Sequence, residues 1–212
     1  MSSQPRRPSV IVELKDRDLV RLYWPAELRP AFDALFAIDD AMGDVVARAT
    51  QPGLGAIKLS WWRERLEELD EGKVPAEPRL QAAANELLPR GITGAELAGL
   101  EAGWAELLGE QPDPEFALQR GVRFFDLGAR LLGEGSDVLP IAGRLYAAGS
   151  WKRRSPSTPG AVLVTETLTI PRRLRPLTGL AALARRDLVR SEPEGTPGRA
   201  LALLRHRMTG RL

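Results

Sequence analysis

The 212-residue sequence contains no cysteine and only one histidine, His206. The absence of cysteine excludes disulfide frameworks, zinc sites with thiolate ligands and cysteine nucleophiles. A single histidine argues against a catalytic triad and against a histidine-rich metal site. The remaining options are chemistry based on carboxylates, lysine or arginine, or no chemistry at all.

Long hydrophobic runs are also missing, so no segment is expected to span a membrane, and residues 1–8 do not resemble a secretory signal. The chain is nevertheless 43% apolar and 27% charged, which is enough for a folded core. We expect a flexible tail over residues 1–10 and a single domain over residues 11–212. The expected location is the cytoplasm, with peripheral attachment at the inner membrane as an option.

The charge is distributed unevenly along the chain. Residues 144–212 hold 14 Lys and Arg against 4 Asp and Glu, whereas residues 1–143 hold 16 against 24. A basic segment of this kind is typical of a region that meets an anionic membrane surface, an acidic protein or nucleic acid. A solvated, arginine-rich surface is the alternative. Since no helix-turn-helix or base-stacking aromatic pattern is present, we do not expect nucleic-acid binding.

Hydrophobic periodicity predicts an all-α fold of about eight or nine helices. Residues 161–170 form the only strand-like stretch, and the sequence offers no partner strand for it. The expected helices cover residues 16–23, 25–50, 54–71, 79–88, 93–108, 115–132, 138–152, 176–190 and 196–208.

Three carboxylates follow one another on the second predicted helix. Asp40 and Asp44 are one turn apart, a spacing that suits Mg²⁺-assisted diphosphate chemistry. A helical wheel places both at the edge of the apolar face or outside it, where they are expected to be surface groups. Asp39 points inward, and a buried carboxylate must be paired or coordinated. We therefore expect Asp39 to meet either a ligand or a buried arginine.

The third predicted helix offers cations that could act with Asp39. The wheel places Lys58 and Arg65 within a buried stripe that contains Trp61 and Trp62. A cation beside tryptophan can form a cation–π contact or a salt bridge, or it can hold a diphosphate. On this basis Asp39, Lys58 and Trp61 are candidate substrate-binding residues.

The same region resembles the squalene/phytoene synthase family. The likeness is fairly specific over residues 16–72, weaker over residues 93–154, and returns over residues 176–188. Its motifs are Arg29-Pro30-Ala31-Phe32-Asp33-Ala34-Leu35-Phe36-Ala37-Ile38 and Pro52-Gly53-Leu54-Gly55-Ala56-Ile57-Lys58-Leu59-Ser60-Trp61-Trp62-Arg63.

This resemblance implies an isoprenoid-synthase-like helical bundle. Active members bind Mg²⁺ and two prenyl diphosphates through two Asp-rich motifs on facing helices. In this sequence the first motif falls on residues 43–47, where only Asp44 is acidic, and both outer ligand positions, Gly43 and Ala47, lack a carboxylate. The second motif falls on residues 147–154, where Arg153 matches the family and is a further candidate substrate-binding residue, but Arg154 replaces the metal-binding aspartate.

The resemblance therefore implies a degenerate member, similar to the branch of the complex I assembly factor, without metal ligands, catalytic residues or a cofactor. Such a protein would bind a prenyl or quinone-like lipid or assist respiratory-complex assembly, with residues 144–212 facing an anionic membrane or an acidic partner. The alternative is an active Mg²⁺-dependent, head-to-head prenyl diphosphate transferase. It would use Asp39, Asp40 and Asp44 in an altered register, with Lys58 and Arg153 on the diphosphate.

Overall fold

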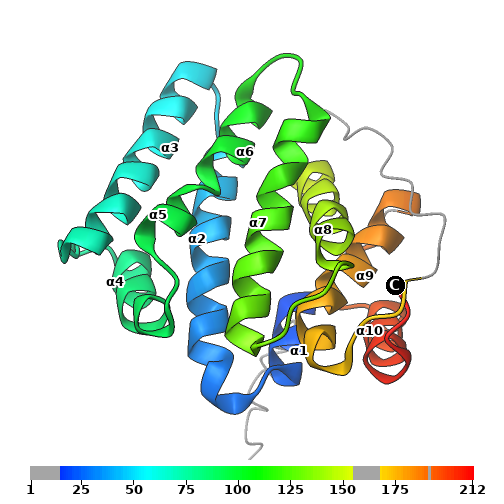
Figure 1. Ribbon diagram of the computed structural model, residues 1–212. Helices are drawn as coiled ribbons and strands as arrows, with labels where there is room; N and C mark the ends of the chain where they lie inside the picture. Colours follow the sequence, from blue (N-terminus) through cyan, green and yellow to red (C-terminus); the bar gives the residue numbers. More distant parts are fainter. Residues whose placement is uncertain (1–14, 155–167, 191) are drawn as a thin grey trace, which may run out of the picture.

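The computed structural model describes residues 15–154, 168–190 and 192–212, and these residues form an all-α bundle (Figure 1). The expected fold class is therefore confirmed. Most of residues 161–170 and the whole of the expected tail lie outside the described residues. The α-helices are α1 (Asp16–Tyr23), α2 (Arg29–Ala47), α3 (Pro52–Glu67), α4 (Pro78–Glu86), α5 (Gly94–Ala98), α6 (Glu101–Ala105), α7 (Pro114–Leu132), α8 (Leu139–Arg154), α9 (Arg175–Val189) and α10 (Pro197–Thr209).

Helices α2 and α7 run through the middle of the bundle (Figure 1). Helices α3, α4 and α5 lie on one side of them, and α8, α9 and α10 lie on the other, with α1 packed against α9 and α10. Short 3₁₀ turns extend several helices at Ala26–Leu28, Glu68–Glu71, Leu88–Arg90, Glu106–Leu108 and Arg172–Leu174.

Two of the predicted helices are divided in the structure. Residues 25–50 form a 3₁₀ turn followed by α2, with Pro30 in the first turn of α2, where a missing backbone N–H costs nothing. Residues 93–108 form α5, α6 and a 3₁₀ turn, because the chain bends at Gly99. The Gly99 carbonyl accepts a hydrogen bond from Arg123 Nη1 at 2.7 Å instead of continuing the helix. Thr93 and Glu96 form a capping box at the start of α5.

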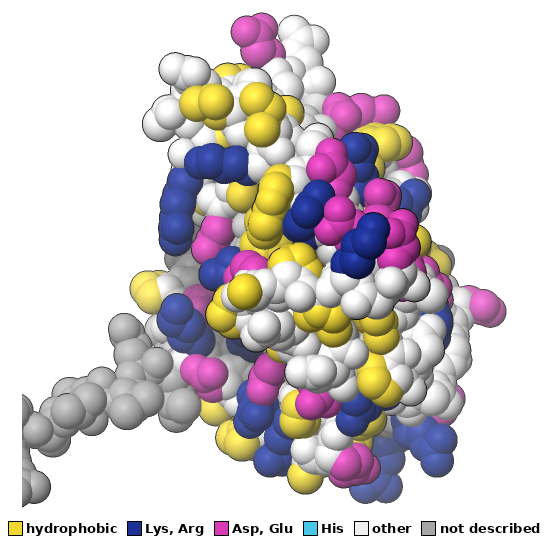
Figure 2. Space-filling view, turned by 90° about the vertical axis from the view of Figure 1, so that its left-hand side faces the viewer, with side chains coloured by type: hydrophobic (Ala, Val, Ile, Leu, Met, Phe, Trp, Pro, Cys, Tyr) yellow, Lys and Arg dark blue, Asp and Glu magenta, His cyan; other side chains and the backbone are white. Residues whose placement is uncertain are grey.

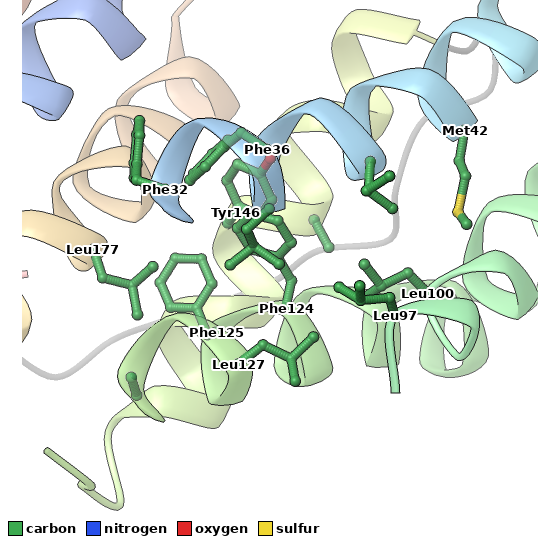
Figure 3. Packing of buried hydrophobic residues seen from close by; sticks show 14 of the residues in the cluster. Phe32, Phe36, Met42, Leu97, Leu100, Phe124, Phe125, Leu127, Tyr146 and Leu177 are labelled. Carbon is green, nitrogen blue, oxygen red and sulfur yellow. The ribbon is translucent and has the colours of Figure 1, made fainter. Parts of the chain in front are cut away.

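The aromatic core lies between α2, α7 and α8. Phe36 of α2 meets Phe124 of α7 edge-on, with ring centroids 4.7 Å apart, and Phe124 stacks on Tyr146 of α8 at 5.2 Å. Phe32 and Phe125 extend the cluster toward α9 (Figure 3). All five rings are buried, so the middle of the bundle is filled by side chains.

Helices α7 and α8 cross in direct backbone contact at two glycines. A Cβ atom on Gly121 would lie 2.0 Å from the carbonyl oxygen of Gly143, and one on Gly143 would lie 2.4 Å from that of Gly121. No side chain larger than hydrogen fits at either position while the helices keep this distance.

The buried face of α3 is not the one that the helical wheel predicts. Gly55, Leu59, Trp62 and Leu66 are buried, whereas Leu54, Ile57 and Trp61 are 53%, 67% and 42% exposed. Gly55 is the physical reason, because a Cβ there would come within 2.9 Å of Leu108. The small residue lets this face approach its neighbour closely, and the bulky residues turn outward.

The end of the strand-like segment that is described has a partner that the sequence did not suggest. Leu168 exchanges backbone hydrogen bonds with Leu212, and the N–H of Ile170 donates to the Gly210 carbonyl at 2.8 Å. Thr169 and Arg211 form an isolated antiparallel bridge. The extended residues therefore pair with the last residues of the chain after α10.

His206 of α10 is buried and has a structural role. Its Nδ1 donates to the Arg211 carbonyl at 2.9 Å, and its Nε2 lies 2.9 Å from the Thr178 hydroxyl of α9. Burial lowers the pKa of His206 below its usual value, and the nearby Arg175 charge adds to this effect. The ring therefore stays neutral in the folded protein at neutral pH.

We expect the free energy of unfolding to fall as the pH drops below about 6.5, because the unfolded chain binds a proton that folded His206 resists. Each unit by which the pKa is lowered is equivalent to about 1.4 kcal/mol. The substitution His206→Asn keeps a donor for the Arg211 carbonyl but does not titrate. Urea unfolding measured at pH 7.5 and at pH 5.0 should show a smaller fall in the free energy of unfolding between the two pH values for this variant than for the wild type. Equal falls would contradict the prediction.

Candidate functional site

Asp39 lies in the middle of α2, only 1% exposed, and is surrounded by three hydrogen-bond donors. Its Oδ1 accepts hydrogen bonds from Trp104 Nε1 of α6 at 2.9 Å and from Arg120 Nη1 of α7 at 2.6 Å. Its Oδ2 accepts one from the Tyr146 hydroxyl of α8 at 2.9 Å. The inward orientation predicted for Asp39 is confirmed, and its cation is a buried arginine, one of the two expected alternatives.

Arg120 completes this cluster, although it is 2% exposed and lies on the apolar face of α7. Its guanidinium carbon lies 3.8 Å from the centre of the Trp104 ring, and its Nη2 donates to the Ser150 hydroxyl at 2.5 Å. A buried arginine that faces both an aromatic ring and a carboxylate is held by cation–π attraction as well as by the ion pair.

Tyr146 takes part as a neutral hydrogen-bond donor. Burial and then the negative charge of Asp39 raise the pKa of Tyr146 well above its usual value, so the phenol keeps its proton. The group of Asp39, Trp104, Arg120 and Tyr146 is called the Asp39 cluster below.

A second ion-pair group lies next to the Asp39 cluster and closer to solvent. Asp40 accepts hydrogen bonds from Arg17 of α1 and from Arg154 Nη2 of α8, the latter at 2.6 Å. Burial alone would lower the pKa of Arg154, but the charges of Asp40 and Asp39 outweigh it and raise the pKa. Arg154 is therefore a permanent cation, and Asp40 is shared between two guanidinium groups.

Gly43 and Arg154 occupy the same small space. A Cβ atom on Gly43 would lie 1.8 Å from Arg154 Nη1 and 2.9 Å from Trp104 Cη2. The arginine side chain thus lies directly on the backbone of α2 and fills the room that a side chain at position 43 would take.

A polar cavity of about 180 Å³ opens between α1, α2, α8 and α9. Cavities that hold small organic ligands usually measure about 300–1,000 Å³, so this one suits a small anion or a few water molecules better than a long isoprenoid. Its polar lining comes from Lys15, Asp16, Arg17, Asp40, Tyr146, Ser150, Arg153, Arg154, Glu194 and Arg199.

The four predicted substrate-binding residues are not brought together. Asp39 is buried in its cluster. Arg153 lines the cavity, but its Nη1 donates to Asp187 Oδ2 at 2.5 Å. Lys58 and Trp61 lie on the exposed side of α3, and neither lines the cavity. The predicted burial of Trp62 is confirmed, but that of Lys58 and Trp61 is wrong, because the buried stripe follows the face of α3 that contains Gly55.

Asp44 is half-buried, with its side chain 45% exposed, and among the described residues it forms a loose ion pair with Arg48, at 3.5 Å. In the part of the chain that the structure describes, no group of three His, Asp or Glu side chains could hold a metal ion. The two positions where the resemblance places outer ligands of the first motif, Gly43 and Ala47, carry no oxygen donor, and Asp40 already accepts from two arginines. These residues do not fit the Mg²⁺ cluster of an active synthase.

The sequence reasoning missed Arg120, Trp104 and Ser150. A usable signal exists for Arg120, which lies three residues after Ala117 and four before Phe124, within the apolar stripe of α7. A charged residue in such a stripe needs an opposite charge on a facing helix, and Asp39 is the inward carboxylate that supplies it. No comparable signal marks Trp104 or Ser150.

Neither a protein-family model nor a curated protein nor a solved structure matches this chain.

Proposed function

We propose that the protein is a non-catalytic member of the squalene/phytoene synthase family, in which arginine–aspartate pairs have replaced the metal–diphosphate site. One observation carries the proposal, namely that Gly43 and Arg154 touch across α2 and α8. The resemblance places one position of each Asp-rich motif at these two residues. Facing helices with the two motif positions in contact are what a synthase scaffold requires.

Arg154 explains why this geometry does not favour metal catalysis. Its guanidinium lies where a carboxylate from α8 would have to meet a metal ion, and it brings a positive charge instead of a negative one. Asp40 is neutralised by Arg154 and Arg17. A Mg²⁺ ion would have to displace both arginines and would still lack ligands from positions 43 and 47.

Two roles follow from the resemblance, and the packed core favours one of them. A prenyl or quinone-like lipid inside the bundle would need the space that Phe36, Phe124, Phe125 and Tyr146 fill (Figure 3). A role in assembling a respiratory complex needs only the outer surface. We therefore propose that the protein acts through its surface as an assembly protein and not as a lipid carrier.

The direct test is turnover of farnesyl and geranylgeranyl diphosphate by the purified protein with Mg²⁺. We expect no diphosphate release and no condensed hydrocarbon above the level without protein, while an active synthase in the same buffer gives both. Product formation at about 1 per second or faster, a typical enzyme rate, would overturn the proposal.

The second candidate function is an active prenyl diphosphate transferase. The observation in its favour is that Asp40, Arg153, Lys15 and Arg154 line one polar cavity. If product does appear, the variant Asp40→Asn separates chemistry by this site from a contaminating activity. Loss of turnover in Asp40→Asn, with Asp33→Asn on the same helix as an unaffected control, would establish the transferase.

The contact between Gly43 and Arg154 predicts a coupled effect on stability. We expect Gly43→Ala to lower the free energy of unfolding by about 1–3 kcal/mol, because the new methyl group drives Arg154 away from Asp40. In the Arg154→Ala background the same change should cost less, since only the contact with Trp104 remains.

Urea unfolding of the two single variants and the double variant measures this coupling, which should exceed about 0.5 kcal/mol. Gly53→Ala is the matched control, because nothing lies within 4 Å of its Cβ position in α3 and alanine is the better helix former. An equal cost of Gly43→Ala in both backgrounds would show that Arg154 does not occupy this space.

A further inference from the structure

Helix α10 has an apolar ridge on its outer side that no described residue covers. Leu201, Leu204 and Met208 follow one another at helical spacing and are 66%, 46% and 72% exposed. The opposite side of α10 is buried, where Arg199, Leu203 and His206 face the bundle. The ridge is therefore the outward face of a firmly packed amphipathic helix.

A basic hollow lies along each flank of this ridge. On one flank, between α9 and α10, a hollow of about 430 Å³ is lined by Arg185, Arg186, Arg205 and Arg211. On the other flank, a hollow that also measures about 430 Å³ is lined by Arg172, Arg175 and Arg207 beside Tyr23. Leu201 borders the first hollow and Met208 borders the second, so the apolar ridge and both hollows form one continuous surface.

Few acidic groups neutralise this surface. Between residues 168 and 212 the acidic side chains are Asp187, Glu192 and Glu194. Asp187 pairs with Arg199 and Arg153, and Glu192 pairs with Arg186. Arg205 and Arg211 form no ion pair with any described residue, and Arg207 stacks on Tyr23 at 4.3 Å and stays exposed. The net charge around the ridge is therefore positive.

We propose that α10 docks on a membrane surface rich in anionic phospholipids, with its axis in the plane of the interface. The apolar ridge would enter the boundary between headgroups and acyl chains, and lipid phosphates would occupy the two hollows. Arginine suits this place because its apolar stem lies along the ridge while its guanidinium binds phosphate.

The shape of the surface favours lipid over an acidic protein partner. Its apolar part is convex and its charged parts are two separate hollows on opposite flanks, whereas docking of a partner helix needs an apolar groove. Lipid headgroups diffuse independently, so they can fill both hollows at the same time. No described helix is long and apolar enough to cross a membrane, and contact through α10 would be peripheral. This inference does not depend on the proposed lack of catalysis.

Helix α3 offers a matched control surface. It exposes Leu54 and Ile57 much as α10 exposes its ridge, but on this side of the molecule basic and acidic side chains are interspersed with apolar ones (Figure 2). Lys58 and Arg63 are exposed cations on α3. Pairs of substitutions on α3 therefore remove the same kinds of groups as pairs on α10 without touching the proposed membrane contact.

The test is co-sedimentation of the full-length protein with vesicles of phosphatidylcholine containing 30% phosphatidylglycerol, and with pure phosphatidylcholine vesicles. We expect binding to the anionic vesicles that weakens with added salt, and much weaker binding to the neutral ones. Arg205→Ser with Arg211→Ser should weaken binding about 25-fold, at about fivefold for each arginine. Leu204→Ser with Met208→Ser should weaken it at least about tenfold.

The pairs Lys58→Ser with Arg63→Ser and Leu54→Ser with Ile57→Ser should leave vesicle binding within about twofold of the wild type. Circular dichroism and urea unfolding confirm that each variant is folded, which is expected because all the replaced side chains are exposed. Three outcomes would each overturn the proposal. They are absence of binding to anionic vesicles, equally strong binding to neutral and anionic vesicles, and an equal loss of vesicle binding in the α3 variants and the α10 variants. The first of these outcomes would leave an acidic protein as the partner of the ridge.

Discussion

Replacing Asp39 with alanine is expected to lower the free energy of unfolding by about 3–5 kcal/mol, the cost of breaking a buried ion pair from one side. The substitution leaves the Arg120 charge 2% exposed without its counter-ion. It also removes the acceptor for Trp104 Nε1 and for the Tyr146 hydroxyl. All three donors come from different helices, so the loss affects the contacts of α2 with α6, α7 and α8 together.

A comparison on the same helix isolates the effect of burial. Asp33 pairs with Arg21 through two hydrogen bonds at 2.7 and 2.8 Å, but both side chains are well exposed. Asp33→Ala should therefore cost less than about 1 kcal/mol in the same urea unfolding experiment. The double variant Asp39→Leu with Arg120→Met removes both charges and should recover much of the loss.

The result also decides what Asp39 is for. A carboxylate kept for binding a ligand is usually held at a cost to stability, and removing it stabilises the protein or changes little. If the free energy of unfolding of the Asp39→Ala variant lies within about 1 kcal/mol of the wild-type value, the ion pair with Arg120 is not what holds Asp39 in place. That result would favour a ligand-binding role for Asp39.

The second large effect is expected at Arg199, which connects three helices near the polar cavity. Arg199 is 1% exposed and binds Asp16 of α1, with Nε to Oδ2 at 2.7 Å, and Asp187 of α9. Burial alone would lower the pKa of Arg199, but its hydrogen bonds to Asp187 and Asp16 raise it above the usual value. Arg199→Met leaves Asp16 and Asp187 buried, and we expect it to cost about 3–5 kcal/mol.

The conservative variant Arg199→Lys keeps the charge but cannot bind two carboxylates with a planar fork, so its cost should be intermediate. Arg207→Met on the same helix replaces an exposed arginine that stacks on Tyr23, and it should cost about 1 kcal/mol or less. Equal unfolding midpoints for the Arg199→Met and Arg207→Met variants would show that the three-helix connection contributes no stability.

Much of the helical framework could be predicted because local signals mark where helices begin and end. The bounds of α1 match the prediction, and those of α7 and α10 differ by one residue at most ends. Proline in the first turn, the capping box at Thr93 and the left-handed Gly72 after Glu71 are all readable from sequence. The division at Gly99 was not predicted, and there the Gly99 carbonyl accepts a hydrogen bond from Arg123, a residue distant in sequence.

The candidate site could be predicted only in part, for a related reason. An inward carboxylate is visible from the periodicity of its own helix, so Asp39 was identified. Its partner lies 81 positions further along the chain, on α7, and periodicity within one helix carries no information about which helix faces it. The neighbouring helix α3 offered Lys58, but α3 packs through the face that contains Gly55, and Lys58 is exposed.

The glycine contact between α7 and α8 has a consequence for inheritance. Arg120 is the residue before Gly121, and its bond to Ser150 of α8 depends on how closely α7 and α8 approach each other. The Tyr146 hydroxyl of α8 reaches Asp39 from the same helix. A larger residue at Gly121 or Gly143 would push α8 away from α7 and lengthen the bonds that α8 makes to Arg120 and Asp39. Descendants of this sequence are therefore expected to lose or keep the two glycines and the Asp39 cluster together, as one heritable unit.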